Sequence, residues 1–120
     1  MPSVGQVLGI KTKNAIGKDS AFKWDFCVCA SDGLYLYVCS RGYVGDFEIT
    51  NEHCPGLHNA VSYISLSRLI HVPDLKMRKA RHACTADSTY PRQFWHHVID
   101  VDVLSERDRS IIVGGLERHF

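Results

Sequence analysis

The stretch Phe22–Arg41, FKWDFCVCASDGLYLYVCSR, decides how the rest of the chain is interpreted. Large apolar residues occupy every second position from Phe22 to Cys29 and again from Leu34 to Cys39. A period of two is typical of a strand with one buried face. Asp32-Gly33 lies between the two runs, and glycine accepts the positive φ angle of a tight turn. The stretch therefore predicts a β-hairpin whose second strand ends in the polar pair Ser40-Arg41.

Other apolar segments predict that a sheet extends beyond this hairpin. Each is rich in β-branched or aromatic residues, or alternates apolar and polar positions. These segments are Val4–Thr12, Asp46–Thr50, Ala60–Val72 with an interruption near Ser67, and a last strand over His97–Val103. The polar, basic segment Asp74–Arg92 is expected to be a long loop, with one helical turn around Leu75–Arg81.

The C-terminal segment predicts a helix. Ser105 and Asp108 have the spacing of a capping box, in which the serine hydroxyl accepts a hydrogen bond from an amide of the first turn. A narrow apolar stripe follows, made of Ile111, Ile112, Gly115 and Leu116. About five short strands and a terminal helix predict one domain, residues 1–120, that is mainly β and forms a small antiparallel β-barrel with a C-terminal helix.

Composition and charge restrict the functions that the chain can perform. The formal net charge is +1, so there is no global positive field, and nucleic-acid binding needs a local patch. The first residues carry neither the basic nor the apolar segment of a secretion signal. No apolar run approaches the roughly 20 residues that span a bilayer. We therefore expect a soluble, cytoplasmic protein with no membrane partner.

The five cysteines favour reduced thiols. They are an odd number, and Cys27 and Cys29 lie on the same face of one predicted strand, which is poor geometry for a disulfide. Buried thiols in a cytosolic protein are the simpler interpretation.

The pair Ser40-Arg41 is the first candidate for chemistry. A guanidinium fits phosphate oxygens in a bidentate manner and stabilises charge that develops on them, and a neighbouring hydroxyl can donate to the same oxygens. Lys23 supplies a second cation if it points to the same rim. The alternative is a polar strand end that enters a turn, with Lys23 and Asp25 on a solvated strand face.

The segment from Lys76 to His82 holds the concentrated positive charge of the chain. Its cations Lys76, Arg78, Lys79 and Arg81 can neutralise several phosphates and make binding depend on salt. Tyr90, Phe94 and Trp95 lie close by in sequence and could stack on bases. The alternative is a solvated surface loop.

Seven histidines raise the question of a metal site. His53, Cys54, His58, His82 and Cys84 are possible ligands, yet no Cys-x-x-Cys or His-Glu-x-x-His spacing occurs. We therefore predict no metal and no cofactor. His96 and His97 are candidates for a general acid or base, with packing as the simpler alternative.

Five short segments together resemble the PemK/MazF family of toxin endoribonucleases, over about Val4 to Leu116. Lys23 to Ser31 is similar to the family's strand that ends in serine, with Lys23-Trp24 where the family has Arg-Pro. The other matching segments are Gly5-Gln6-Val7, Tyr37 to Ser40, Ser62-Tyr63-Ile64 and Leu104-Ser105-Glu106. The resemblance implies an SH3-like barrel that forms a homodimer.

The resemblance also implies metal-independent cleavage of single-stranded RNA, in which the ribose 2′-hydroxyl attacks the adjacent phosphate. Ser40 and Arg41 would contact that phosphate, with Lys23 as a second cation, and a protein antitoxin would cover the site. Lys76, Arg78, Lys79 and Arg81 would hold the RNA backbone. The alternatives from another class are a non-catalytic SH3-like interaction module and a mobile-element accessory protein that binds a host protein or nucleic acid.

Overall fold

The computed structural model describes residues 3–11, 22–57, 59–73 and 80–120. The described strands are β1 (Gln6–Lys11), β2 (Phe22–Cys29), β3 (Leu34–Cys39), β4 (Phe47–Thr50), β5 (Val61–His71) and β6 (Arg81–Thr85). The described helices are α2 (Tyr90–Asp100) and α3 (Glu106–His119). The bounds of β2 and β3 agree with the two halves of the predicted hairpin.

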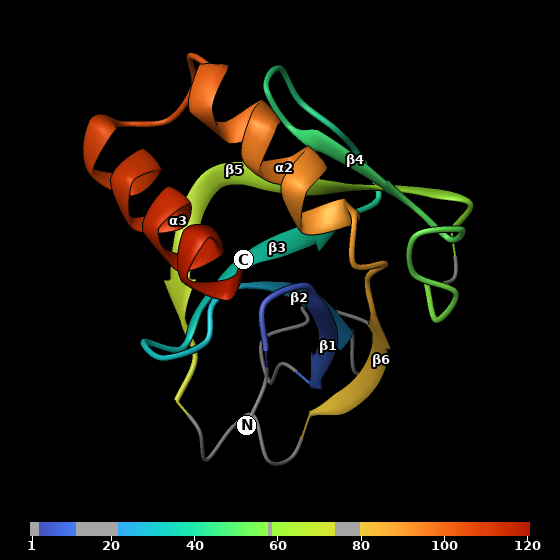
Figure 1. Cartoon of the computed structure of the whole chain (residues 1–120). Coiled ribbons are helices and arrows are strands. Elements are labelled where there is room, and N and C mark those ends of the chain that lie inside the picture. Colours follow the sequence, from blue (N-terminus) through green and yellow to red (C-terminus); the bar gives the residue numbers. More distant parts are fainter. Residues whose placement is uncertain (1–2, 12–21, 58, 74–79) are drawn as a thin grey trace.

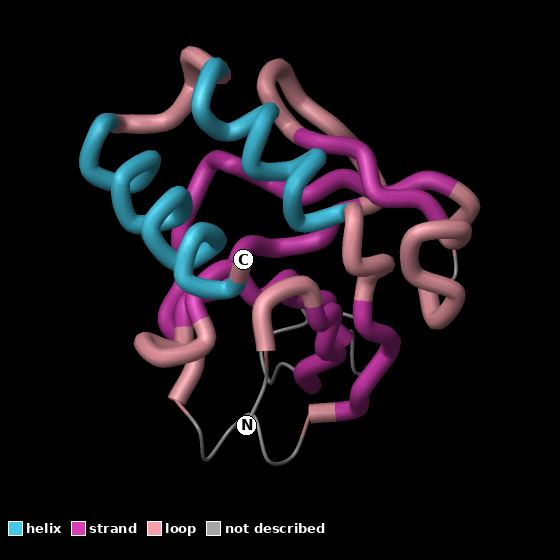
Figure 2. The backbone as a smooth tube through the Cα atoms, viewed as in Figure 1, coloured by secondary structure: helices cyan, strands magenta, loops and turns pink. Residues whose placement is uncertain are grey.

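The six strands form one sheet in the order β4-β5-β3-β2-β1-β6, and every neighbouring pair is antiparallel. The sheet curls into a half-barrel, and both helices cover the same face of it (Figure 1; Figure 2). The prediction of a mainly β chain with a curled antiparallel sheet and a C-terminal helix is confirmed.

A disulfide joins the two ends of this curled sheet. Cys54 lies shortly after the edge strand β4, and Cys84 lies in the opposite edge strand β6, yet their Cα atoms are 5.6 Å apart and their sulfur atoms are bonded. The prediction of reduced thiols is therefore wrong for these two residues. Their proximity arises from the curl of the sheet, which local sequence patterns do not show.

The hairpin turns where the sequence predicts it. Gly33 has a φ of +63°, which glycine adopts without steric cost. Trp24 pairs with Val38, and Phe26 pairs with Leu36, but the register shifts between Cys27 and Cys29. A bulge of this kind changes the direction of the side chains that follow it.

Strand β5 contains a second irregularity. Ile64 pairs with Val38, whereas the next pair toward the end of β5 is Leu69 with Leu36, so the residues from Ser65 to Arg68 lie opposite Tyr37 alone. The predicted interruption near Ser67 agrees with this shift. The strand nevertheless continues to His71, just before Pro73.

The segment before α3 departs most from the predictions. The expected strand over His97–Val103 is wrong, because residues up to Asp100 belong to α2. Tyr90, Phe94 and Val98 recur every four residues and are buried, so the helical period outweighs the short alternation. Strand β6 also lies in the segment expected to be a loop, where it pairs with β1.

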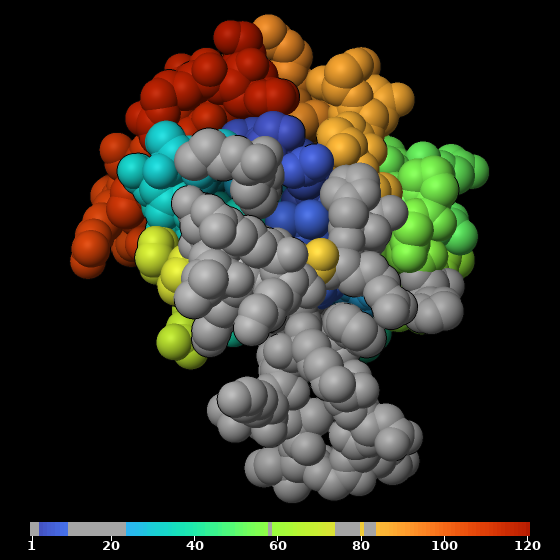
Figure 3. All heavy atoms as spheres, turned by 90° about the horizontal axis from the view of Figure 1, so that it is seen from below, coloured from blue at the N-terminus to red at the C-terminus, as the bar shows by residue number. Residues whose placement is uncertain are grey.

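The helix α3 begins and packs as predicted. The side chain of Ser105 accepts a hydrogen bond from the Asp108 amide at 3.1 Å. Gly115 then allows a close approach to β2, since a Cβ atom at this position would lie 2.3 Å from the carbonyl oxygen of Val28. Seen from below, α3 and the turn between β2 and β3 adjoin one another (Figure 3).

Aromatic residues dominate the core between the helices and the sheet. The ring centroids of Phe26 and Phe94 are 5.3 Å apart, and Phe47 lies 5.6 Å from Phe94. A smaller apolar cluster on other strand positions contains Cys27 and Tyr35. Among the described residues, no helix has both the length and the apolar character needed to cross a membrane.

Candidate functional site

A pocket of about 480 Å³ lies beside the end of β3. The loop between β3 and β4 forms one wall, and the irregular part of β5 forms another. Its lining residues are Tyr37, Cys39, Arg41, Tyr43, Val44, Asp46, Ser65, Leu66, Ser67 and Val103. The pocket thus combines a cation, a carboxylate, two phenols, two hydroxyls and exposed apolar groups.

Asp46 fixes the loop that forms the first wall. One carboxylate oxygen accepts a hydrogen bond from the Tyr43 amide at 2.9 Å, and the other accepts one from the Leu66 amide at 3.0 Å. The Asp46 amide also donates to the Tyr43 carbonyl oxygen at 3.0 Å. Asp46 therefore ties the loop both to itself and to β5.

The helix α2 also contacts this loop. Nε2 of His97 donates a hydrogen bond to the carbonyl oxygen of Gly45 at 2.6 Å, and the His97 ring stacks on Phe47. Gly45 has a φ of +90° and lies against Val103, so any larger residue here would disturb the loop. His97 consequently has a packing role, as the simpler alternative predicted, and His96 is exposed.

The second wall carries a pair of hydroxyl groups. The Oγ atoms of Ser65 and Ser67 are 2.8 Å apart, and both residues lie in the part of β5 where the register shifts. Ser67 is exposed, whereas Leu66 between them is buried in the core. Both hydroxyls therefore lie beside the pocket, in the irregular part of β5.

The three predicted catalytic residues differ in where they lie relative to the pocket. Arg41 is exposed and lines the pocket, which is the position that a phosphate contact requires. Ser40 is also exposed, at the end of β3, but does not line this pocket. The backbone of Lys23 lies in β2, next to the pair of Trp24 with Val38, and its side chain is outside the described residues.

Asp25 does not lie on a solvated strand face, as the alternative for Lys23 and Asp25 supposed. It is only 2% exposed and pairs in register with Tyr37. The reason is that the second face of the hairpin is also covered, as the burial of Cys27 and Tyr35 shows.

Much of the predicted RNA-binding segment lies outside the described residues. This holds for Lys76, Arg78 and Lys79, and for the side chain of Arg81, whose backbone begins β6.

The aromatic residues proposed to stack on bases are instead mostly core residues, so that prediction is wrong for Tyr90 and Phe94. Both are at most 1% exposed because they form the inner face of α2. The Tyr90 hydroxyl donates to the Glu48 carbonyl oxygen at 2.6 Å, and burial raises the pKa of this phenol above its usual range. Trp95 is partly buried against the same core.

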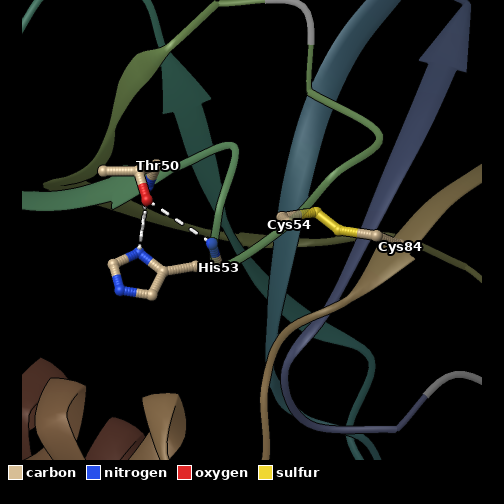
Figure 4. The surroundings of a disulfide bond; sticks show 4 residues. All are labelled: Thr50, His53, Cys54 and Cys84. Carbon is tan, nitrogen blue, oxygen red and sulfur yellow. Dashed lines mark hydrogen bonds between the residues drawn. A yellow bond between two sulfur atoms is a disulfide. The ribbon is translucent and has the colours of Figure 1, made fainter.

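The candidate metal ligands are used for structure. Cys54 and Cys84 are bonded to each other, and Nδ1 of His53 accepts a hydrogen bond from the Thr50 amide at 3.0 Å (Figure 4). His58 and the His82 side chain lie outside the described residues. Within the described part of the chain, no group of three or more His, Cys, Asp or Glu residues is arranged to hold a metal ion.

Several residues of the pocket were missed by sequence reasoning, Tyr43 and Val44 above all. They are 69% and 90% exposed, although both are apolar or amphipathic. The signal was present in the run Gly42-Tyr43-Val44-Gly45, where large side chains stand between two glycines in a loop, since binding residues are concentrated on loops.

Comparisons with protein-family models, with curated proteins and with solved structures find no match for this chain. Its function is therefore argued from the pocket and from the chemistry of the residues around it.

Proposed function

We propose that the chain binds single-stranded RNA at the Arg41 pocket and cleaves it without a metal ion, as a toxin-type endoribonuclease. The observation that carries the proposal is the position of Arg41 in a pocket whose rim includes the exposed ring of Tyr43. A guanidinium next to an exposed aromatic ring suits a nucleotide, because one binds phosphate and the other stacks on a base.

The chemistry that we propose follows from the cation. The ribose 2′-hydroxyl gives its proton to water as its oxygen attacks the phosphorus atom. The bond to the 5′-oxygen then breaks and this oxygen takes up a proton, so that a cyclic phosphate and a 5′-hydroxyl remain. Arg41 stabilises the negative charge that develops on the phosphate oxygens during this step. Asp46 is not proposed as the base, since both of its oxygens already accept amide hydrogen bonds.

The remaining predicted contacts are part of the same proposal. Ser40 directly precedes Arg41 and is exposed, and we propose it as a second contact of the phosphate. Lys23 adds a second cation from β2, and Lys76, Arg78, Lys79 and Arg81 hold the RNA backbone. A homodimer and a protein antitoxin that covers the pocket are further proposals.

A non-catalytic interaction module is the second candidate, and one observation favours it. Val44 and Val103 are exposed apolar residues at the pocket, and such residues also suit a protein partner. In that case Arg41 would bind an acidic side chain and not a phosphate.

The test uses a fluorescently labelled single-stranded RNA of mixed sequence, with a chelator present. We expect Arg41→Ala to weaken binding by at least about tenfold, since a hydrogen-bonded charge is worth that much or more. The dependence of log K on log salt should become less steep by about one unit. Arg107→Ala is the matched control, because Arg107 is exposed on α3 and does not line the pocket.

Cleavage is measured in the same samples. We expect a 2′,3′-cyclic phosphate end on the RNA and no cleavage of the DNA of the same sequence, which lacks the nucleophile. RNA binding without cleavage would refute the endoribonuclease and leave a non-catalytic RNA site. No RNA binding by the unmodified chain would support the protein-interaction module, and equal binding by the Arg41→Ala and Arg107→Ala variants would refute an RNA site in this pocket.

A further inference from the structure

A second cleft, of about 260 Å³, lies between the turn that joins β2 to β3 and the last turn of α3. Cys29, Ser31, Gly115, Arg118 and His119 are among its lining residues. The turn and the helix that form it adjoin on the face of the molecule shown in Figure 3. This cleft shares no lining residue with the Arg41 pocket.

The sulfur atom of Cys29 is surrounded by polar groups. Nη2 of Arg118 donates a hydrogen bond to it at 3.1 Å. The Cys29 thiol is also 3.6 Å from a carboxylate oxygen of Asp32 and 3.6 Å from the hydroxyl oxygen of Ser31. A cation, a proton acceptor and a hydroxyl thus gather around one thiol, and the imidazole of His119 lines the same cleft.

The bulge of β2 explains this position. Without it, Cys27 and Cys29 would share one face, as the sequence pattern predicted. The register shift lies between them, and the Cβ atom of Cys29 lies against Gly115 of α3, while Cys27 packs in the apolar cluster with Tyr35. Bulges commonly change the direction of a functional side chain.

The two thiols therefore differ in chemistry. Burial raises the pKa of Cys27 to about 12, which keeps that thiol protonated and unreactive. Cys29 is equally buried, at 1% exposed, but its sulfur touches the guanidinium of Arg118, whose residue is exposed. An anion that pairs with Arg118 competes with the Cys29 sulfur for this guanidinium. Loss of the guanidinium contact would expose the sulfur.

We propose that this cleft is a thiol–disulfide exchange site, in which Cys29 forms a mixed disulfide with a small anionic disulfide compound. The Cys29 thiol gives up its proton, its sulfur attacks one sulfur of the compound, and the disulfide bond of the compound breaks. The leaving thiolate takes up a proton, so one disulfide is consumed and one is formed. Arg118 supplies the positive charge that recruits carboxylates.

The experiment uses the full chain with oxidised glutathione as the anionic probe and bis(2-hydroxyethyl) disulfide as a neutral one. Peptide mass mapping after acid quenching identifies which cysteine is modified and how fast. We expect Cys29 to be modified by glutathione faster than Cys27 or Cys39. Arg118→Gln should slow this reaction about fivefold, the effect of one partly exposed ion pair, and should leave the reaction with the neutral probe equally fast or faster.

Arg107→Gln is the matched control, since it removes an exposed arginine from the first half of the same helix. A thermal unfolding midpoint equal to that of the unmodified chain checks that both variants are folded. The proposal fails if Cys39 or Cys27 reacts first with glutathione. It also fails if Arg118→Gln and Arg107→Gln react at the same rate, or if Arg118→Gln slows both probes equally.

Discussion

The helix-covered face of the sheet and the Arg41 pocket are built on the same strands but held by different forces. On the covered face, Phe26, Phe94 and Ile112 are fully buried and fix the structure by packing. At the pocket, Tyr43 is 69% exposed, and the two oxygens of Asp46 hold the loop by hydrogen bonds. One region is fixed by apolar contacts, and the other mainly by hydrogen bonds of Asp46 and His97.

The difference indicates where substitutions will be felt. Burial of apolar area supplies most of the stability of a domain, so the covered face should determine whether the chain folds. Hydrogen bonds contribute less net stability but fix geometry, so the pocket should determine what the folded chain binds. We therefore expect substitutions on the covered face to change mainly stability, and substitutions at the pocket to change mainly binding.

The largest effect is expected from Phe94→Ala. Phe94 has no exposed surface and contacts the rings of Phe26 and Phe47. Its removal leaves a cavity in the core and should lower the free energy of unfolding by about 4 kcal/mol. Chemical denaturation followed by tryptophan fluorescence measures the change.

Tyr43→Ala is the matched control for this comparison, because it removes an aromatic ring of similar size from the pocket. It should change the free energy of unfolding by less than about 0.5 kcal/mol, as exposed positions generally do. Similar losses in both variants would contradict the division between a packed face and a loop-built pocket.

A smaller loss is expected when the link between the sheet edges is removed. Cys54 and Cys84 are separated by 30 residues, and a disulfide that closes a loop of this length stabilises a fold by about 3.5 kcal/mol. The double variant Cys54→Ala, Cys84→Ala should be less stable by that amount, measured by denaturant unfolding.

A reducing agent provides the control for the disulfide. It should lower the stability of the unmodified chain to nearly that of the double variant, and should leave the double variant unchanged. RNA binding at the Arg41 pocket should persist in both, since neither cysteine lines it. An unmodified chain that is unaffected by full reduction would show that the bond does not stabilise the fold.

Local patterns predicted the parts of the fold that local forces determine. The β2–β3 hairpin and the α3 cap follow from alternation, a glycine turn and one serine hydroxyl. The α2 helix was missed because its last residues alternate like a strand, while the deciding period runs from Tyr90 to Val98. The strand β6 was missed because its pairing with β1 joins distant segments.

The site was predicted less completely for the same reason. Arg41 was found because it directly follows a predictable strand. Ser65 and Ser67 belong to the part of β5 where the register shifts, and Val103 belongs to the segment after α2. No short-range pattern specifies that these segments meet, so their contribution to the pocket appears only in three dimensions.

A loss of stability smaller than that from the disulfide, together with a clear effect on binding, is expected from Asp46→Ala. This substitution removes the acceptor for the Tyr43 and Leu66 amides and should lower the free energy of unfolding by about 2 kcal/mol, the value of a hydrogen-bonded charge. The loop that carries Arg41 should then lose its fixed position, so RNA affinity should fall about as much as in Arg41→Ala, although Asp46 repels phosphate by its charge.

The control is Asp102→Ala, which removes the same charge at an exposed position that does not line the pocket and should leave affinity unchanged. Tighter RNA binding by Asp46→Ala would mean that the carboxylate acts mainly through its charge, and that the loop keeps its shape without it.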